Sequence, residues 1–289
     1  MPKQKILGTY KVREDIDESE IIKAKIEEAR SYLKKKLEEA NSIQNQCYKN
    51  ICMFSLIDSL AQEYADYPTQ DAQKTFCDFV IKYQDRYSYL GKVEPVTLFY
   101  DYEPYIREIE RHPELRDIVP ELCSKEKEIS LMDLRLEDEK KVEEIIDSDK
   151  AKELLNLIER DYDVNTAEKF KKRHTLINLL YKMRSKSVHE LSRMGGANKW
   201  EIKAGYDEPF YRDMSRIYTS NGNIVSDNIF ELVFPSGFIY NLAANVIGNY
   251  LSECDKQQRL PFENNSNFRR DVTYTWNDKK IIAKSNLAN

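Results

Sequence analysis

The sequence has few of the features that mark several common protein classes. No apolar run approaches the roughly 18 residues of a membrane-spanning helix, and the first residues lack the apolar core of a secretion signal. Eight glycines and nine prolines in 289 residues are few for an all-β chain with many tight turns. We therefore expect a mainly helical protein of the cytoplasm with no membrane partner.

Signatures of metal and nucleotide sites are also missing. There are only three histidines, and the pair His189-Glu190 does not extend to an HExxH zinc motif because Arg193 stands at the second histidine position. The five cysteines form no CxxC pair, and their odd number favours free thiols in a reducing compartment. No phosphate-binding glycine loop or GxSxG motif occurs. The sequence thus predicts no metal site and no cofactor.

Hydrophobic residues make up 41% of the chain, which is enough for a substantial core, and their spacing predicts helices. Apolar side chains recur every three or four residues in three early segments, 16–40, 47–66 and 72–84. A long charged helix is expected over 121–160. Asp163 has the chemistry of an N-cap and predicts a further helix that continues to about Ser192.

Strand signals are confined to the second half of the chain. Asn221-Gly222 lies between alternating segments and predicts a β-hairpin, and Asn277-Asp278 predicts a last strand pair in the tail. Pro235 opens an apolar helix that runs to about Cys254. The predicted fold is mainly α, a helical bundle with a small β-hairpin insertion. We expect a helical body over 1–196 and a small β element over 197–234. A C-terminal helix and a short β tail, over 235–289, are expected to pack on the body.

The net charge of -5 conceals two oppositely charged segments. Residues 101–163 carry 21 acidic and 11 basic side chains, whereas residues 165–194 carry eight basic and two acidic ones. The basic helix could simply pair with the acidic segment. Alternatively it forms a positive strip that faces the phosphates of a nucleic acid, shielded by the acidic segment until RNA or a partner displaces it.

Two other features of the sequence each have two interpretations. Asp58 and Ser59 interrupt an apolar helix, where they either form buried hydrogen bonds, the preferred interpretation, or take part in catalysis. The segment 83–105 is rich in tyrosine and phenylalanine, which could stack on unpaired bases or form a packing cluster. The sequence alone does not decide between stacking and packing for the aromatic segment.

The basic helix carries a cation on an otherwise apolar seam. Phe170, Ile177 and Leu191 share a heptad position with Arg184. A cation there is costly unless it has a partner, lines a cleft or lies at a subunit contact. Five residues later comes His189, the side chain type best suited to move protons near neutral pH.

Residues 184–190 read RSKSVHE at the end of an apolar helix, and this resembles the R-x(4–6)-H motif of the HEPN superfamily. The helices around 55–64 and 79–83 also resemble parts of HEPN-like bacterial proteins, and the resemblance covers roughly residues 16–260. Arg107 and His112 have the same spacing, but Pro113 follows in an acidic context, so the later pair is preferred. The family consists of helical bundles that dimerise with two motifs facing one another. Many are metal-independent ribonucleases that serve as toxins or antiviral effectors.

The resemblance implies roles for named residues. Arg184 and His189 would be catalytic, and Lys182, Ser185 and Lys186 would contact RNA. No cofactor and no metal is implied, and the expected partners are RNA, a second copy of the chain, and an antitoxin or regulatory protein.

Ser185 departs from the family pattern, which usually has Asn, Asp or His directly after the arginine. This departure supports the alternative of a non-catalytic dimeric module that binds RNA or protein. A third possibility is a scaffold in which Arg184 is ion-paired to the acidic region 101–163. On a straight helix five residues turn by roughly 140°, so Arg184 and His189 do not share one face. A local distortion, fraying of the helix before Gly195, the length of the arginine or a second subunit would have to unite them in one cleft.

Overall fold

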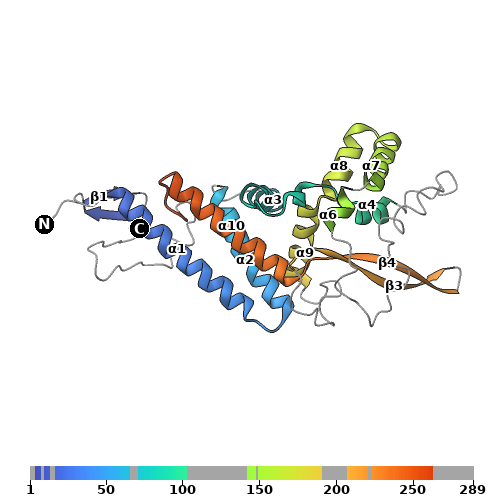
Figure 1. Cartoon of the computed structure of the whole chain (residues 1–289), viewed down its shortest axis with the longest axis horizontal. Helices are drawn as coiled ribbons and strands as arrows, with labels where there is room; N and C mark the ends of the chain where they lie inside the picture. The colour runs from blue at the N-terminus through green and yellow to red at the C-terminus, as the bar shows by residue number, and fades with distance from the viewer. Residues whose placement is uncertain are drawn as a thin grey trace. The chain divides into compact units, whose positions relative to one another are not determined.

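In a computed structural model, the described part of the chain is mainly helical with a minor β component, which confirms the predicted fold class (Figure 1). The residues that the structure describes are 4–7, 10–13, 17–65, 71–102, 142–147, 149–190, 207–220 and 223–262. Within these ranges, no helix combines the length and the apolar character needed to cross a membrane.

The chain divides into two compact units. Unit 1 comprises Met1–Arg86 and Tyr240–Asn289, and unit 2 comprises Tyr87–Ile239. These boundaries differ from the sequence-predicted parts, whose limits lie at 196/197 and 234/235, and those parts stay a prediction.

Unit 1 contains three helices that the spacing of apolar residues predicted correctly. They are α1 (Glu18–Asn41), α2 (Gln46–Tyr64) and α3 (Ala72–Tyr83). Each begins at an Asp or Asn whose side chain accepts a hydrogen bond from a backbone N–H of the first turn, which satisfies a donor that the helix itself leaves unpaired. These N-caps are Asp17, Asn45 and Asp71.

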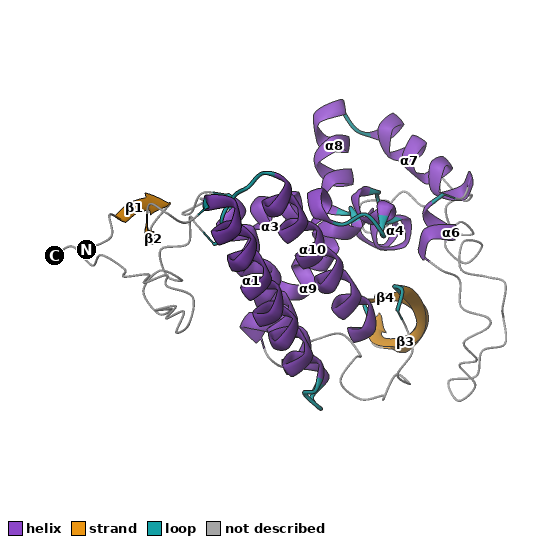
Figure 2. Ribbon diagram, turned by 60° about the vertical axis from the view of Figure 1, so that its left-hand side comes forward, coloured by secondary structure: helices purple, strands orange, loops and turns teal. Residues whose placement is uncertain are grey.

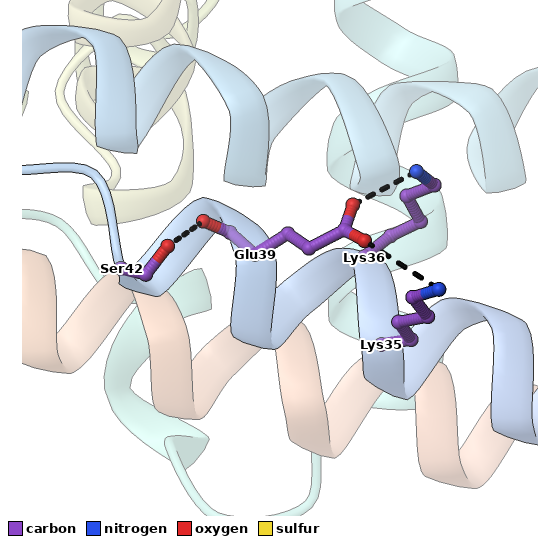
Figure 3. A network of polar contacts seen from close by, with 4 residues as sticks. All are labelled: Lys35, Lys36, Glu39 and Ser42. Carbon is purple, nitrogen blue, oxygen red and sulfur yellow. Dashed lines mark hydrogen bonds and ion pairs between the residues drawn. The ribbon is translucent and has the colours of Figure 1, made fainter.

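The last turns of α1 show how this helix balances its own charges (Figure 3). The carboxylate of Glu39 lies 2.8 Å from Nζ of Lys36 and 4.0 Å from Nζ of Lys35. The hydroxyl of Ser42 donates to the carbonyl oxygen of Glu39 at 2.7 Å and closes the helix end. Such pairs at three- and four-residue spacing stabilise a helix surface modestly.

Helix α10 (Ser236–Lys256) confirms the predicted Pro-initiated helix, and most of it belongs to unit 1. The ring of Tyr250 lies 5.7 Å from that of Phe79 and 5.5 Å from that of Tyr83, measured between centroids. The amide of Asn249 donates to the carbonyl oxygen of Tyr83 at 2.7 Å. Side chains far apart in sequence thereby join α10 to the end of α3 in one aromatic core.

Unit 2 begins with a short 3-10 helix and continues through several α-helices. In chain order these are η1 (Ser88–Gly91), α4 (Pro95–Tyr102), α6 (Val142–Ile146), α7 (Asp149–Asp161), α8 (Val164–Arg173) and α9 (Leu176–Glu190). Helices α7 and α8 pack against each other (Figure 2). The N-cap prediction for α8 is confirmed, since Asp163 accepts from two backbone N–H groups. The pKa of this carboxyl is lowered by hydrogen bonds from the hydroxyl of Thr166 and from these backbone groups.

The charged helix predicted over 121–160 is not continuous in its described portion. Helix α6 ends at Ile146 and α7 starts at Asp149, with Asp147 in the turn between them. Both carboxylate oxygens of Asp147 accept from Nζ of Lys92, at 2.7 and 2.8 Å. An aspartate in this position favours a helix end, and the ion pair holds it there.

The single helix predicted from the Asp163 cap to about Ser192 is also wrong, because it breaks at His174 and Thr175. Thr175 forms an antiparallel bridge with Val93. The N–H of Glu94 donates to the carbonyl oxygen of His174 at 2.8 Å, and the N–H of Leu176 donates to that of Lys92 at 3.0 Å. Hydrogen bonds to a distant segment therefore replace the helical ones at this point, and sequence periodicity does not report such bonds.

The β-hairpin predicted within 197–234 is confirmed. Strands β3 (Phe210–Ser220) and β4 (Asn223–Val233) pair antiparallel along their whole length. The register places Arg212 opposite Glu231 and Arg216 opposite Asp227.

A second hairpin was not predicted. Strands β1 (Gln4–Leu7) and β2 (Tyr10–Arg13) pair antiparallel near the start of the chain. The strand pair predicted around Asn277-Asp278 lies outside the described residues.

Candidate functional site on helix α9

All five candidate site residues lie on one helix. Helix α9 is continuous from Leu176 to Glu190. Leu176, Ile177 and Leu180 are buried and fix the side of α9 that faces the core of unit 2. The orientation of the candidate residues on α9 follows from this buried side.

Arg184 lies seven residues after Ile177 and thus on nearly the same side of α9. It is half-buried, as the apolar seam predicted, and its guanidinium carbon lies 5.5 Å from the centroid of the Tyr181 ring. At this distance the guanidinium is within range of a cation–π interaction with the ring. A guanidinium is also the side-chain group suited to bidentate binding of a phosphate.

The other candidates lie on a different side. Lys182 is exposed and Ser185 is half-buried, whereas the side chains of Lys186 and His189 lie outside the described part of α9. Lys182 and His189 are seven residues apart, so their backbone positions differ by only about 20° around the helix axis. Ser185 lies within roughly 60° of both. The backbone of α9 thus brings Lys182, Ser185 and His189 to one side.

Arg184 and His189 are not brought together within one copy of the helix. Because α9 is regular between them, the backbone separates the two residues by roughly 140° and by about 7.5 Å along the axis. The local distortion that could have united them is not present in the backbone. Arg184 and His189 can therefore act at one phosphate only through the length of the arginine side chain or through a second copy of the chain.

Part of the basic segment is paired with acidic side chains. Nζ of Lys171 on α8 lies 2.8 Å from a carboxylate oxygen of Glu159 on α7 and also pairs with Glu168. Hydrogen bonds to these two carboxylates raise the pKa of Lys171. The pairing interpretation thus holds for this lysine, while Lys182 on α9 is exposed. The charge of the basic segment is divided between its two helices.

Burial decides two sequence alternatives for some of their residues, while Asp58 is half-buried. Ser59 is exposed, and its hydroxyl donates to the carbonyl oxygen of Ser55 at 2.9 Å, so the interpretation as a core hydrogen bond is wrong for this residue. Tyr83 in unit 1 and Tyr87 and Tyr89 in unit 2 are buried against other rings of their own unit, which leaves them no face for stacking on a base. Tyr105 lies outside the described residues.

Sequence reasoning missed a buried acidic residue next to α9. The side chain of Glu94 is completely buried, and its two carboxyl oxygens accept from the N–H groups of Val96 and Thr97, each at 2.7 Å. The hydroxyl of Tyr211 donates to the same carboxyl group. Pro95 at the first position of α4 was the available signal, since proline favours that position and the preceding residue then acts as the cap.

The described residues contain no cluster of three His, Cys, Asp or Glu that could hold a metal ion. The cysteines among them, Cys47, Cys52, Cys77 and Cys254, are free thiols. No protein-family model, curated protein or solved structure matches this chain significantly. Membership of the HEPN superfamily therefore stays a prediction from the sequence motif.

Proposed function

We propose that this chain is a metal-independent RNA endonuclease that acts as a homodimer. The observation that carries the proposal is Arg184, a half-buried cation on the core-facing side of α9, with His189 five residues later in the same unbroken helix. A guanidinium beside an aromatic ring is a residue type suited to phosphate recognition. The exposed Lys182 on the same helix adds a phosphate contact.

The proposed reaction uses the ribose itself as the nucleophile. The 2′-oxygen attacks the neighbouring phosphorus while a base removes its proton, and the bond from phosphorus to the 5′-oxygen breaks. An acid gives a proton to that leaving oxygen, and the products are a 2′,3′-cyclic phosphate and a 5′-hydroxyl. His189 is the proposed base or acid, and Arg184 stabilises the charge that develops on the phosphate oxygens.

A second copy of the chain completes the proposed site. Two facing α9 helices supply two copies of His189, one as base and one as acid, and two copies of Arg184. This arrangement removes the difficulty that the two residues lie roughly 140° apart on one helix. Ser185 and Lys186 are the further proposed contacts to the RNA backbone.

The alternative is a dimeric module that binds RNA or a protein without cleaving RNA. The angular separation of Arg184 and His189 favours it, together with serine at position 185. In that case the basic residues of α9 would bind phosphates, and the affinity would fall steeply with salt.

The test is cleavage of a 5′-labelled single-stranded RNA of mixed sequence in EDTA. We expect Arg184→Ala and His189→Ala each to abolish cleavage while the dimer persists by light scattering. Arg30→Ala is the matched control, because it removes an equal charge from α1 in unit 1. Binding without products would favour the alternative, and cleavage at equal rates in the two motif variants would refute the assignment.

The biological setting is also proposed. A ribonuclease of this kind in the cytoplasm would damage its own cell unless restrained, which fits a toxin or an antiviral defence effector with an antitoxin or regulatory partner. Co-expression provides the check: growth arrest on induction should require both Arg184 and His189.

A further inference from the structure

The beginning of α9 is held by a segment from elsewhere in unit 2. Lys92, Val93 and Glu94 run antiparallel to His174, Thr175 and Leu176 and form two backbone hydrogen bonds with them, at 2.8 and 3.0 Å. This pairing ends α8 and sets the first residue of α9. The orientation of the candidate site thus depends on where the segment 92–94 lies.

That segment is fixed by the carboxyl group of Glu94. One of its oxygens accepts from the N–H of Val96 and from the hydroxyl of Tyr211, and the other accepts from the N–H of Thr97. Because Glu94 is completely buried, water cannot replace a donor that is lost. Tyr211 therefore supplies a third donor that solvent does not replace.

Tyr211 belongs to the base of the β3–β4 hairpin. A second tyrosine–glutamate hydrogen bond, with the tyrosine on the other segment, is formed at the same place. The hydroxyl of Tyr89 donates to the carboxyl group of Glu208, just before β3. Burial and the bond to this carboxylate raise the pKa of Tyr89. Two tyrosine–glutamate bonds of opposite direction thus join the segment 89–94 to the hairpin base, but Glu208, unlike Glu94, is partly exposed.

We propose that Glu94 and Tyr211 form a positioning node for α9, through which a change at the base of the hairpin reaches the helix that carries Arg184 and His189. Displacement of the hairpin base removes the Tyr211 donor, loosens the buried carboxyl group and weakens the pairing of 92–94 with 174–176. The consequence for catalysis rests on the proposed function, whereas the coupling itself does not.

Hydrogen exchange tests the coupling directly. The N–H groups of Leu176 and Glu94 report the pairing, since each donates across it. In Tyr211→Phe we expect both to exchange about tenfold faster, because a buried acceptor has lost a donor. In Tyr89→Phe, the matched control at the same hairpin base, water can hydrate the partly exposed Glu208, and exchange should change less than about twofold.

Unchanged exchange at Leu176 and Glu94 in Tyr211→Phe would overturn the proposal, and so would equal acceleration in the two tyrosine variants. If Tyr211→Phe does not fold, Glu94→Gln takes its place, and the same acceleration is expected because one acceptor oxygen is lost. The RNA assay separates the two proposals. If the chain cleaves RNA, Tyr211→Phe should lower kcat with little change in KM, and rescue is not expected from added salt. If it does not cleave RNA, the exchange result still decides the coupling.

Discussion

Leu180→Ala tests whether α9 is packed as described. Leu180 is completely buried, on the side of α9 that also carries Ile177 and Arg184. Replacing a buried leucine by alanine costs about 3 kcal/mol, the sum of lost apolar burial and the cavity left behind. For a unit the size of Tyr87–Ile239, that corresponds to a melting temperature lower by roughly 6–12 °C.

The assay is urea and thermal unfolding followed by circular dichroism at 222 nm. Lys182→Ala is the control on the same helix, because Lys182 is exposed and its removal should change the free energy of unfolding by less than about 0.5 kcal/mol. A cost below about 1 kcal/mol for Leu180→Ala would refute the reasoning. The core-facing side of α9 would then be another one, and the half-buried position of Arg184 would lose its significance.

Three further predictions concern charge, pH and thiol reactivity. Glu159→Gln leaves Lys171 only its pair with Glu168 and should tighten RNA binding a few-fold in filter binding with a steeper salt dependence; unchanged affinity would defeat the shielding hypothesis. Hydrogen bonds lower the pKa of Asp163, so its contribution to stability is present above its unfolded pKa of about 3.9 and is lost as the pH falls through the folded pKa. Asp163→Asn keeps the cap but should reduce the loss of urea resistance between pH 7 and pH 3, and an unaltered pH profile would contradict this. Iodoacetamide with peptide mapping should label the exposed Cys52 long before Cys254, whose pKa is raised by burial, and equal rates would show that α10 is not packed as described.

The helices of unit 1 were predictable because each depends on its own sequence. The apolar spacing suffices to place such a helix, and the structure reproduces the predicted limits to within about two residues. The β3–β4 hairpin was predictable for the same reason, since the Asn-Gly pair and the alternation are local signals.

The helix breaks of unit 2 were not predictable, because distant residues cause them. Nothing in the sequence around His174 and Thr175 stops a helix, and the periodicity continues through both. The break exists because Lys92 and Glu94 provide backbone partners about 80 residues earlier in the chain. A tertiary hydrogen bond of this kind overrides local propensity.

The residues of the candidate site were predictable from the sequence, but the contacts that hold α9 in place were not. The sequence indicated Arg184 on an apolar seam, and the half-buried position agrees with that indication. Glu94 and Tyr211 are separated by more than a hundred residues, and no pattern links them. Their bond can be found only after the fold has brought them together.

The regularity of α9 makes the oligomeric state the decisive property of this protein. A single helix presents Lys182, Ser185 and His189 on one side and Arg184 on another. A nuclease that uses both Arg184 and His189 at one phosphate is therefore best built from two copies, with Arg184 from one copy and His189 from the other. Mixed dimers of Arg184→Ala and His189→Ala chains provide the test. If one phosphate is served by Arg184 of one copy and His189 of the other, the mixed dimer keeps one such pair and part of the activity. If the mixed dimer stays inactive while the wild-type dimer cleaves RNA, the reaction needs both copies of His189, one as base and one as acid, or needs both residues from one copy.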